Sequence, residues 1–380
     1  MKKILLVFIT IILTTNIAAQ LSGDGYYRVQ NYVTKRYVYI IDNKGSVDIP
    51  TSRVDMGAII LWKDFEKAAS DPASVIHIKN VTGAEHDLYA QNTSTLDITG
   101  GYHVKIRDNK DGTYMASGTA YGVTIYLSDV SKSSTPYGFM NDGTGDYRKW
   151  HIIPINQDKD KYFGVKADVN SNGYYYTTMY ANFPFSTTSP DTKVYTICNV
   201  KDNIAIIREE TGDIAAGTPV IFRCNTNKPV DNKLDIHYSD VAAIKDNCLQ
   251  GTYYCNSEYN HINRVANNKT TMRVLGIMSN GELGFISADC EYMPANKAYL
   301  TVPAGTAEEL DIMTEEEYQE YVANQGGNEP GTPDNIKSVK ADKSKSGIYT
   351  ILGVKVSDNA EDIDNLPKGL YIINGKKYIK

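Results

Sequence analysis

Short apolar segments separated by turn residues run through almost the whole chain, and they constrain the fold more than any other feature. In residues 27–31 and 123–127, apolar and polar side chains alternate, and Gly, Asn or Asp stands at most junctions along the chain. Such alternation is typical of strands that bury one face. The chain also has 29 Tyr against 8 Phe and 2 Trp, and tyrosine suits half-exposed strands. The sequence therefore predicts an all-β protein.

The length of the chain limits the number of domains, and its net charge bears on the kind of partner. A chain of 380 residues is long enough for two or three domains. Its formal net charge of −6 argues against a nucleic-acid partner, because binding to phosphates needs a basic surface.

Three loosely similar units divide the first part of the chain. Their expected strands are residues 27–31, 36–40 and 59–62, then 75–80, 87–90 and 102–106, then 112–115, 123–127 and 149–153. Three such units predict a compact β-domain at residues 22–156, closed into a barrel so that no edge strand is left unpaired.

This pattern resembles the β-trefoil domain of ricin-type lectins, in which an aromatic side chain near the end of each unit fills the core. Trp62 and Trp150 stand in that place, although no unit has the Gln-x-Trp motif. The resemblance implies a sugar site with an aromatic face and polar groups on the hydroxyls. The residues expected to form it are Asp42, Asn43, Trp62, Asp129 and Tyr137. The alternative is that the tryptophans fill the core and the Asp and Asn residues form turns.

A charged stretch at residues 157–161 marks the boundary to a second β-rich domain, expected at residues 157–303. Residues 182–185, 214–222 and 293–300 resemble, in this order, the motifs of a module common in exported proteins of Bacteroidetes. A Gly-Thr-Pro turn before one strand and Asn-Lys-Ala before another predict an antiparallel sandwich. The resemblance implies no catalytic activity.

One segment of this domain has half of a calcium-loop pattern. Residues 168–173 read Asp-Val-Asn-Ser-Asn-Gly, with oxygen ligands at alternate positions. Met179 stands where such a loop needs its bidentate Glu. An Asn-Gly hairpin turn explains the segment better, so we expect neither a metal ion nor a cofactor.

The chain has no convincing catalytic motif. The five cysteines are an odd number, so at least one thiol has no partner within the chain, while a Cys248–Cys255 bridge and buried free thiols both stay open. Neither the cysteines nor His237 and His261 lie in a nucleophile or zinc pattern. We therefore expect a protein that is not an enzyme. The alternative is a glycan hydrolase whose two carboxylates meet only in space.

Both ends of the chain carry targeting features. Lys2 and Lys3 precede an apolar run at residues 4–13, and Ala18 and Ala19 supply small residues, which predicts a signal peptide at residues 1–19. The run is too short to be a permanent membrane span, and no later segment is long enough, so no transmembrane segment is expected after signal removal.

Residues 347–380 have two apolar strands, 348–352 and 370–373, around a Leu-Pro-Lys-Gly turn. They resemble the C-terminal sorting domain of type IX secretion cargo in Bacteroidetes. The resemblance implies a small β-sandwich that is recognised by outer-membrane secretion machinery. Before it, residues 304–346 are expected to hold one helix, opened by a capping box of Thr314 and Glu317, and a flexible linker.

These features predict a secreted or cell-surface binding protein, lectin-like or adhesin-like, with a glycan or glycoprotein as its partner. A secreted hydrolase and a purely structural surface protein are the alternatives.

Overall fold

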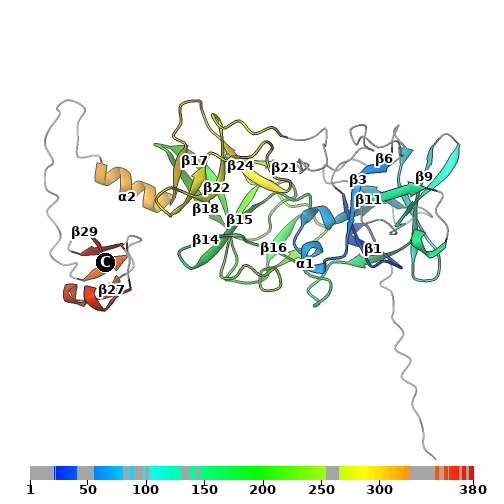
Figure 1. Ribbon diagram of the computed structural model, residues 1–380, viewed down its shortest axis with the longest axis horizontal. Helices are drawn as coiled ribbons and strands as arrows, with labels where there is room; N and C mark the ends of the chain where they lie inside the picture. The colour runs from blue at the N-terminus through cyan, green and yellow to red at the C-terminus, as the bar shows by residue number, and fades with distance from the viewer. Residues whose placement is uncertain are drawn as a thin grey trace, which may run out of the picture. The chain divides into compact units, whose positions relative to one another are not determined.

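The computed structural model of the chain is nearly all β-structure, which confirms the predicted fold class (Figure 1). Within the described residues the α-helices are α1 (Phe65–Ala68) and α2 (Glu315–Gln325). The contacts divide the chain into two units, Met1–Val322 and Ala323–Lys380. The structure describes residues 21, 23–40, 55–79, 86–89, 97–98, 102–120, 122–129, 137–141, 145–253, 265–325, 347–350, 355–357, 359–367, 370–373 and 376–380. The expected signal peptide lies outside these residues and stays a prediction.

The first part of the larger unit contains strands β1 to β12. They are β1 (Gly25–Asn31), β2 (Tyr37–Ile40), β3 (Asp55–Trp62), β4 (Ile76–Lys79), β5 (His86–Tyr89), β6 (Asp97–Ile98), β7 (Tyr102–His103), β8 (Lys105–Asp108), β9 (Tyr114–Ala120), β10 (Val123–Ser128), β11 (Tyr137–Asn141) and β12 (Lys149–Pro154).

Six of these strands form a closed barrel. They pair in the order β1-β12-β9-β8-β5-β4, and β4 returns to β1 through Gly25↔Ile78 and Tyr27↔Ile76. The other six pair as hairpins, β2 with β3, β6 with β7 and β10 with β11. A six-stranded barrel capped by three hairpins, one from each unit of four strands, is the β-trefoil topology.

The boundary between the first and second repeating units differs from the predicted one by one strand. Residues 75–80 were expected to open the second unit, but β4 is the fourth strand of the first unit, as β8 and β12 are in theirs. Alternation identifies a strand but not the hairpin to which it belongs. The short helices α1 and η1 (Pro72–Ser74) inserted between β3 and β4 hid this relationship.

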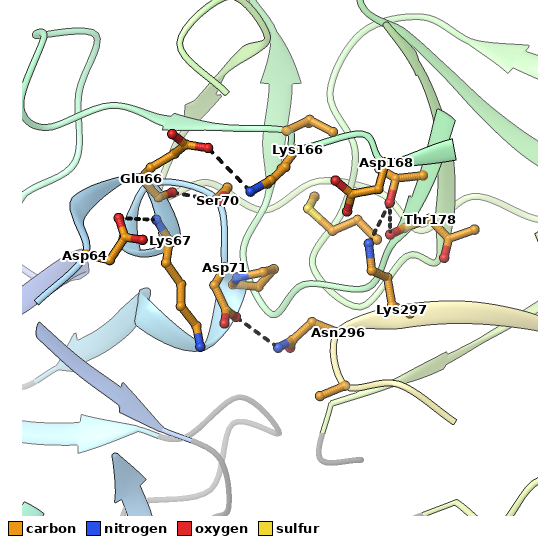
Figure 2. Close-up of a pocket in the computed structure, with 15 residues that line it drawn as sticks. Asp64, Glu66, Lys67, Ser70, Asp71, Lys166, Asp168, Thr178, Asn296 and Lys297 are labelled. Carbon is orange, nitrogen blue, oxygen red and sulfur yellow. Dashed lines mark hydrogen bonds and ion pairs between the residues drawn. The ribbon is translucent and has the colours of Figure 1, made fainter. Parts of the chain in front are cut away.

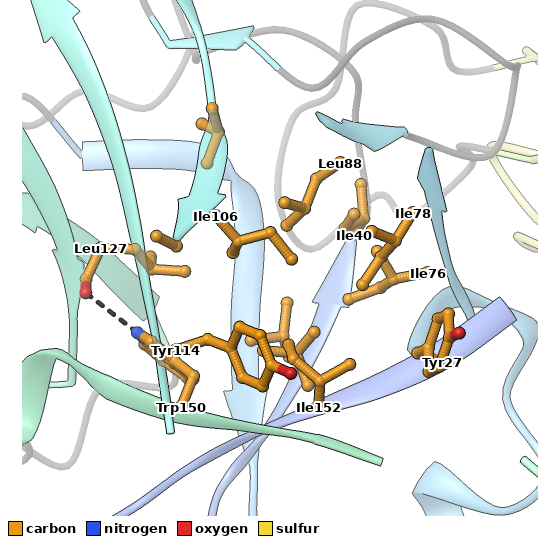
Figure 3. Packing of buried hydrophobic residues seen from close by; sticks show 14 of the residues in the cluster. Tyr27, Ile40, Ile76, Ile78, Leu88, Ile106, Tyr114, Leu127, Trp150 and Ile152 are labelled. Carbon is orange, nitrogen blue, oxygen red and sulfur yellow. Dashed lines mark hydrogen bonds between the residues drawn. The ribbon is translucent and has the colours of Figure 1, made fainter. Parts of the chain in front are cut away.

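The barrel is filled by apolar side chains that surround Trp150 (Figure 3). Trp150 is completely buried, and its indole Nε1 donates to the carbonyl of Leu127 at 3.1 Å. The prediction that Trp150 fills the core is therefore confirmed. The same prediction is wrong for Trp62, which lies on the hairpin strand β3 and packs in a separate cluster with Tyr37 and Tyr39 beneath α1.

The second part of the larger unit contains two sheets. Ten strands pair in the order β14-β15-β19-β17-β18-β25-β23-β22-β24-β21, and three more pair as β13-β20-β16. Their bounds are β13 (Phe163–Gly164), β14 (Val169–Ser171), β15 (Tyr174–Met179), β16 (Phe185–Thr187), β17 (Lys193–Lys201), β18 (Ile204–Glu210), β19 (Val220–Cys224), β20 (Lys233–Ile236), β21 (Leu249–Thr252), β22 (Met272–Ile277), β23 (Leu283–Ile286), β24 (Lys297–Thr301) and β25 (Glu309–Thr314).

The larger sheet departs from the expected antiparallel pattern at one place. Strands β18 and β25 are parallel, with Ile204 opposite Asp311. Parallel neighbours need a long connection, and here the chain passes through β19 to β24 before it returns beside β18. The expected Asn-Gly turn is confirmed: β14 and β15 form a hairpin through Asn172 and Gly173, with φ of 52° and 82°.

The two ends of the larger sheet approach each other at β15 and β24. The hydroxyl of Thr178 joins them, because it accepts from the amide of Ala298 at 3.0 Å and donates to the Ala298 carbonyl at 3.2 Å. We call Thr177, Thr178, Lys297 and Ala298 the seam. The Thr178 side chain and one backbone bond, from the amide of Tyr180 to the carbonyl of Asn296 at 2.9 Å, connect the two strands here, and the described residues of β15 and β24 form no backbone ladder with each other.

A buried arginine fixes α1 against the second part of the unit. Arg28 on β1 is 1% exposed, and its guanidinium donates to the carbonyls of Ala68, Lys161 and Tyr162 at 3.0, 3.1 and 2.7 Å. Burial lowers its pKa to about 10. The amide of Gly164 also donates to the Ala69 carbonyl at 2.8 Å. The end of α1 therefore has a fixed position beside β13.

Helix α2 begins as predicted. The amide of Glu317 donates to the Thr314 hydroxyl at 3.2 Å, and the Glu317 carboxylate accepts from the Thr314 amide at 2.7 Å, which is the expected capping box. The helix packs through Tyr318 on Ile204 and Ile206. Among the described residues, no helix has the length and apolar character needed to cross a membrane.

The smaller unit has one sheet in the order β27-β26-β28-β29. The described residues form this single sheet with the 3-10 helix η4 (Ala360–Asn365) rather than the two facing sheets of a sandwich. Ile348, Tyr371 and Ile373 form its core, with Ile363 and Leu366 packed against them. Its strands are β26 (Ile348–Thr350), β27 (Lys355–Ser357), β28 (Leu370–Ile373) and β29 (Lys376–Ile379).

Candidate functional site

A pocket of about 370 Å³ lies between the two short helices of the trefoil and the seam of the second sheet (Figure 2). Its floor and walls come from segments that are far apart in the sequence. They are Asp64, Glu66, Lys67, Ser70, Asp71, Pro72, Val165, Lys166, Asp168, Thr177, Thr178, Met179, Ala295, Asn296 and Lys297.

Two aspartates build the helical wall. Asp64 caps α1 by accepting from the amide of Lys67 at 3.3 Å. Asp71 caps η1 by accepting from the amide of Ala73 at 3.0 Å, and Pro72 stands at the first position of that helix. Aspartate is a favoured cap because its oxygen satisfies an amide that has no partner in the helix. The two caps turn the chain twice and bring the Asp71 carboxylate to the pocket.

The opposite wall comes from the turn before β24. Asn296 has a φ of 57°, a left-handed conformation that asparagine tolerates better than most residues. Its carbonyl accepts from the amide of Tyr180 at 2.9 Å, and its side-chain amide donates to Asp71 at 3.3 Å. Asn296 therefore connects the trefoil wall to the seam across the pocket.

Lys297 is the most unusual group in the pocket. Its ammonium donates to the Thr177 hydroxyl at 2.5 Å, and this is its single hydrogen bond to the described residues. An ammonium has three donors. Burial lowers the pKa of Lys297, although the carboxylates of Asp168 and Asp71 act against this shift. Two donors of a desolvated amine are therefore left for a ligand or water.

Burial also disfavours the charge of the facing acid. It raises the pKa of Asp71 above the ordinary aspartate value, against the opposing effects of the Ala73 amide, Lys67 and Lys297. At the exposed rim, Lys166 and Glu66 form an ion pair of 3.4 Å. The lining thus contains both signs of charge, and desolvation disfavours the charged forms of Asp71 and Lys297.

A second hollow of about 380 Å³ shares Asp168, Thr177, Thr178 and Lys297 with the first. Its other lining residues are mostly apolar. They are Val169, Val274, Leu275, Ala288, Asp289, Cys290, Pro294 and Ala298.

Of the five residues expected to bind sugar, Trp62 and Asp129 are not among the residues that line this pocket. Asp42 and Asn43 lie outside the described residues. Tyr137 lies on β11, opposite Ile60. Asp129 is buried, where its carboxylate accepts from the Thr34 hydroxyl and pairs with the Arg36 guanidinium at 2.8 Å through Nε. A sugar site at these residues stays a prediction.

Trp62 is separated from the pocket by one side chain. Lys67 lines the pocket, and its ammonium lies 4.1 Å from the centre of the Trp62 indole. The sequence did give signals for two pocket residues, since Asp168 opened the calcium-like segment and Lys297 belonged to the Asn-Lys-Ala-Tyr-Leu motif. It gave none for Asp71, because a cap on a short helix looks like any other turn aspartate.

Two of the cysteine and histidine residues weighed as catalysts, Cys255 and His261, lie outside the described residues. Cys198, Cys224, Cys248 and Cys290 are free thiols. Burial raises the pKa of Cys224 to about 12. His237 bonds to Ser239 at 2.7 Å. Within the described ranges, no three His, Cys, Asp or Glu residues are grouped for a metal ion.

Comparisons with known proteins add little to this geometry. No protein-family model matches the chain, and no curated protein matches its sequence. One similar solved structure is a lectin from Polyporus squamosus bound to the human-type influenza-binding epitope Neu5Aca2-6Galb1-4GlcNAc, with 12% identity and a TM-score of 0.25. The match covers 35% of this chain and 50% of the lectin chain, so this chain spans about half of that protein. A likeness at this level assigns neither a site nor a ligand.

Proposed function

We propose that this chain is a non-catalytic glycan-binding protein and that its ligand occupies the pocket between α1, η1 and the seam. The observation that carries the proposal is the ammonium of the half-buried Lys297, which has one hydrogen bond to the described residues and lines the pocket together with the half-buried Asp71. A desolvated titratable group with a perturbed pKa in a pocket is a candidate for ligand recognition.

The chemistry of the lining favours a polyhydroxylated ligand. Each sugar hydroxyl can both donate and accept, so it can use the donors of Lys297 and Asn296 together with the acceptor of Asp71. Four acids and three lysines line the pocket, which disfavours a strongly charged ligand of either sign. Its volume of about 370 Å³ is within the usual size of small-ligand sites.

The direct test is a glycan array with the full chain, followed by titration calorimetry on the glycans that bind. Lys297→Met keeps the length of the side chain and removes its donors. We expect it to weaken binding roughly tenfold to a hundredfold, because a charged hydrogen bond contributes about 1.5–3 kcal/mol. Lys193→Met is the matched control, since Lys193 pairs with Glu209 on the surface away from the pocket. Unchanged binding by Lys297→Met, or no glycan bound at all, would refute the proposal.

Asn296 offers a second test that separates backbone from side chain. Asn296→Gly keeps the left-handed turn and removes the amide that holds Asp71. We expect a loss of affinity of about threefold to tenfold, because a typical intramolecular hydrogen bond contributes about 0.5–1.5 kcal/mol, while the melting temperature stays near that of the parent. If Asn296→Ala weakens binding and Asn296→Gly does not, the turn alone matters.

A glycan hydrolase is the second candidate, and one observation favours it. Asp71 and Asp168 line the same pocket, and burial raises the pKa of Asp71, as a general acid requires. Incubation of the full chain with the glycans bound on the array, and measurement of new reducing ends, distinguishes the two functions. Steady release of reducing ends that disappears in both Asp71→Asn and Asp168→Asn would show that the protein is a hydrolase rather than a binding protein.

The proposed place of action is the cell surface or the medium. It rests on the expected signal peptide at residues 1–19 and on the resemblance of residues 347–380 to a sorting domain. Mass spectrometry of the protein from the native cells tests both. We expect a mature chain that begins at Gln20 and is recovered outside the cytoplasm. A cytoplasmic chain that still begins at Met1 would refute this placement.

A further inference from the structure

The hollow beyond Lys297 forms where two strands separate. Strands β22 and β24 pair through Met272↔Thr301 and Arg273↔Leu300 and then part. Beyond this point each strand is paired with its other neighbour. Val274 of β22 lies opposite Ile286 of β23, and Ala298 of β24 lies opposite Gly251 of β21. Val274, Leu275, Lys297 and Ala298, which would have continued the ladder, line the hollow instead.

The hollow adjoins the proposed glycan pocket. Asp168, Thr177, Thr178 and Lys297 line both spaces, so these side chains lie where the two spaces meet. The polar groups are concentrated on the side of α1 and η1. Beyond the seam, apolar side chains dominate, and Val169, Val274, Leu275 and Ala288 are only half-buried.

We propose that this hollow is a subsite for an apolar group attached to the glycan, so that the ligand is a glycan with an alkyl, acyl or aryl aglycone. The inference rests on the proposed function and extends it. The sugar occupies the polar pocket, Lys297 donates to an oxygen near the junction, and the aglycone passes the seam to lie against Val274 and Leu275. Its burial supplies affinity that a free glycan cannot obtain.

The first experiment compares ligands that differ in the aglycone alone. Methyl, butyl and octyl glycosides of glucose, galactose, mannose and N-acetylglucosamine are titrated into the full chain, with octyl compounds below their micelle concentration. We expect affinity to rise roughly two- to fourfold per methylene that enters the hollow. Methyl glycosides that bind without any gain from butyl or octyl would overturn the subsite and leave the proposed function intact. If no glycoside binds, both fail.

Two variants localise the gain to the hollow. Val274→Thr keeps the shape of the side chain and makes it polar, and Ala288→Leu reduces the space from another wall. Both are expected to lower the octyl-to-methyl affinity ratio at least threefold and to leave methyl glycoside affinity unchanged. Val123→Thr on β10 is the control, because Val123 is 60% exposed on the trefoil. A ratio that stays at the parent value in both variants would place the alkyl chain elsewhere and overturn the inference.

Discussion

The trefoil barrel and the ten-stranded sheet differ in how the two ends of each sheet are joined. The barrel closes by backbone pairing of β1 with β4, and its interior is filled around Trp150. The larger sheet brings its ends together through the Thr178 side chain and one backbone bond, from Tyr180 to Asn296. A backbone ladder pairs the amides and carbonyls of the barrel strands, whereas the seam has no such ladder and leaves Lys297 and Thr177 beside the pocket. The less completely closed sheet is therefore where a ligand can be recognised.

The largest expected effect is on the barrel core. Trp150→Ala should destabilise the protein by about 3–5 kcal/mol, because it opens a cavity in a closed barrel and leaves the Leu127 carbonyl without the indole donor. Trp62→Ala should cost clearly less, since Trp62 is half-buried in a small cluster. Urea unfolding of both variants measures the difference. Equal losses would mean that the cluster beneath α1 matters as much as the barrel.

The second prediction concerns the joint between the trefoil and the second part of the unit. His77 on β4 is 6% exposed, and its ring centre lies 4.6 Å from that of Tyr26. Burial lowers its pKa from 6.5 to about 4. The unfolded chain therefore binds the proton first as the pH falls. Stability that is fully present above pH 6.5 should decrease by about 3 kcal/mol as the pH falls toward 4.

Melting temperatures between pH 4 and 8 measure this loss, with His77→Gln as the control. The variant cannot titrate in this range, so its stability curve should be flatter than that of the parent. Parallel curves for the two proteins would mean that other groups cause the acid sensitivity.

The third prediction breaks the seam. Thr178→Val keeps the shape of the side chain but leaves the buried amide of Ala298 without its acceptor, which should cost about 1–3 kcal/mol. Thr178→Ser retains the hydroxyl and should cost less. Urea unfolding gives the stability, and titration with the glycans found on the array gives the binding. A stable Thr178→Val variant would show that strand pairing elsewhere holds the sheet ends together.

The same contrast explains what could be read from the sequence. Alternation and turn residues predicted the all-β class, the three-unit trefoil, the Asn172–Gly173 hairpin and the α2 cap, because each depends on neighbouring residues. The candidate pocket depends on Asp71 and Lys297, which are far apart in the chain and meet through the curl of a sheet. No local pattern specifies that curl. The prediction that Trp62 fills the barrel core failed for a related reason. The sequence around Trp62 predicts a strand, but it does not show whether that strand belongs to the barrel or to a hairpin.

The smallest expected effect tests how burial and charge balance in the pocket. Asp71→Asn keeps an oxygen that can cap η1 and removes a buried charge, whereas Asp71→Ala loses the cap at a cost of about 1 kcal/mol. Because burial raises the pKa of Asp71 in the folded protein, the unfolded chain ionises first as the pH rises through 3.8. The parent therefore loses stability over that window and Asp71→Asn does not, so the advantage of the variant should grow with pH and then stay constant. Melting temperatures from pH 3 to 8 measure it. If the advantage instead shrinks as the pH rises, Lys67 and Lys297 stabilise the carboxylate more than burial penalises it, and the pocket is organised as an ion-pair network rather than as a desolvated site.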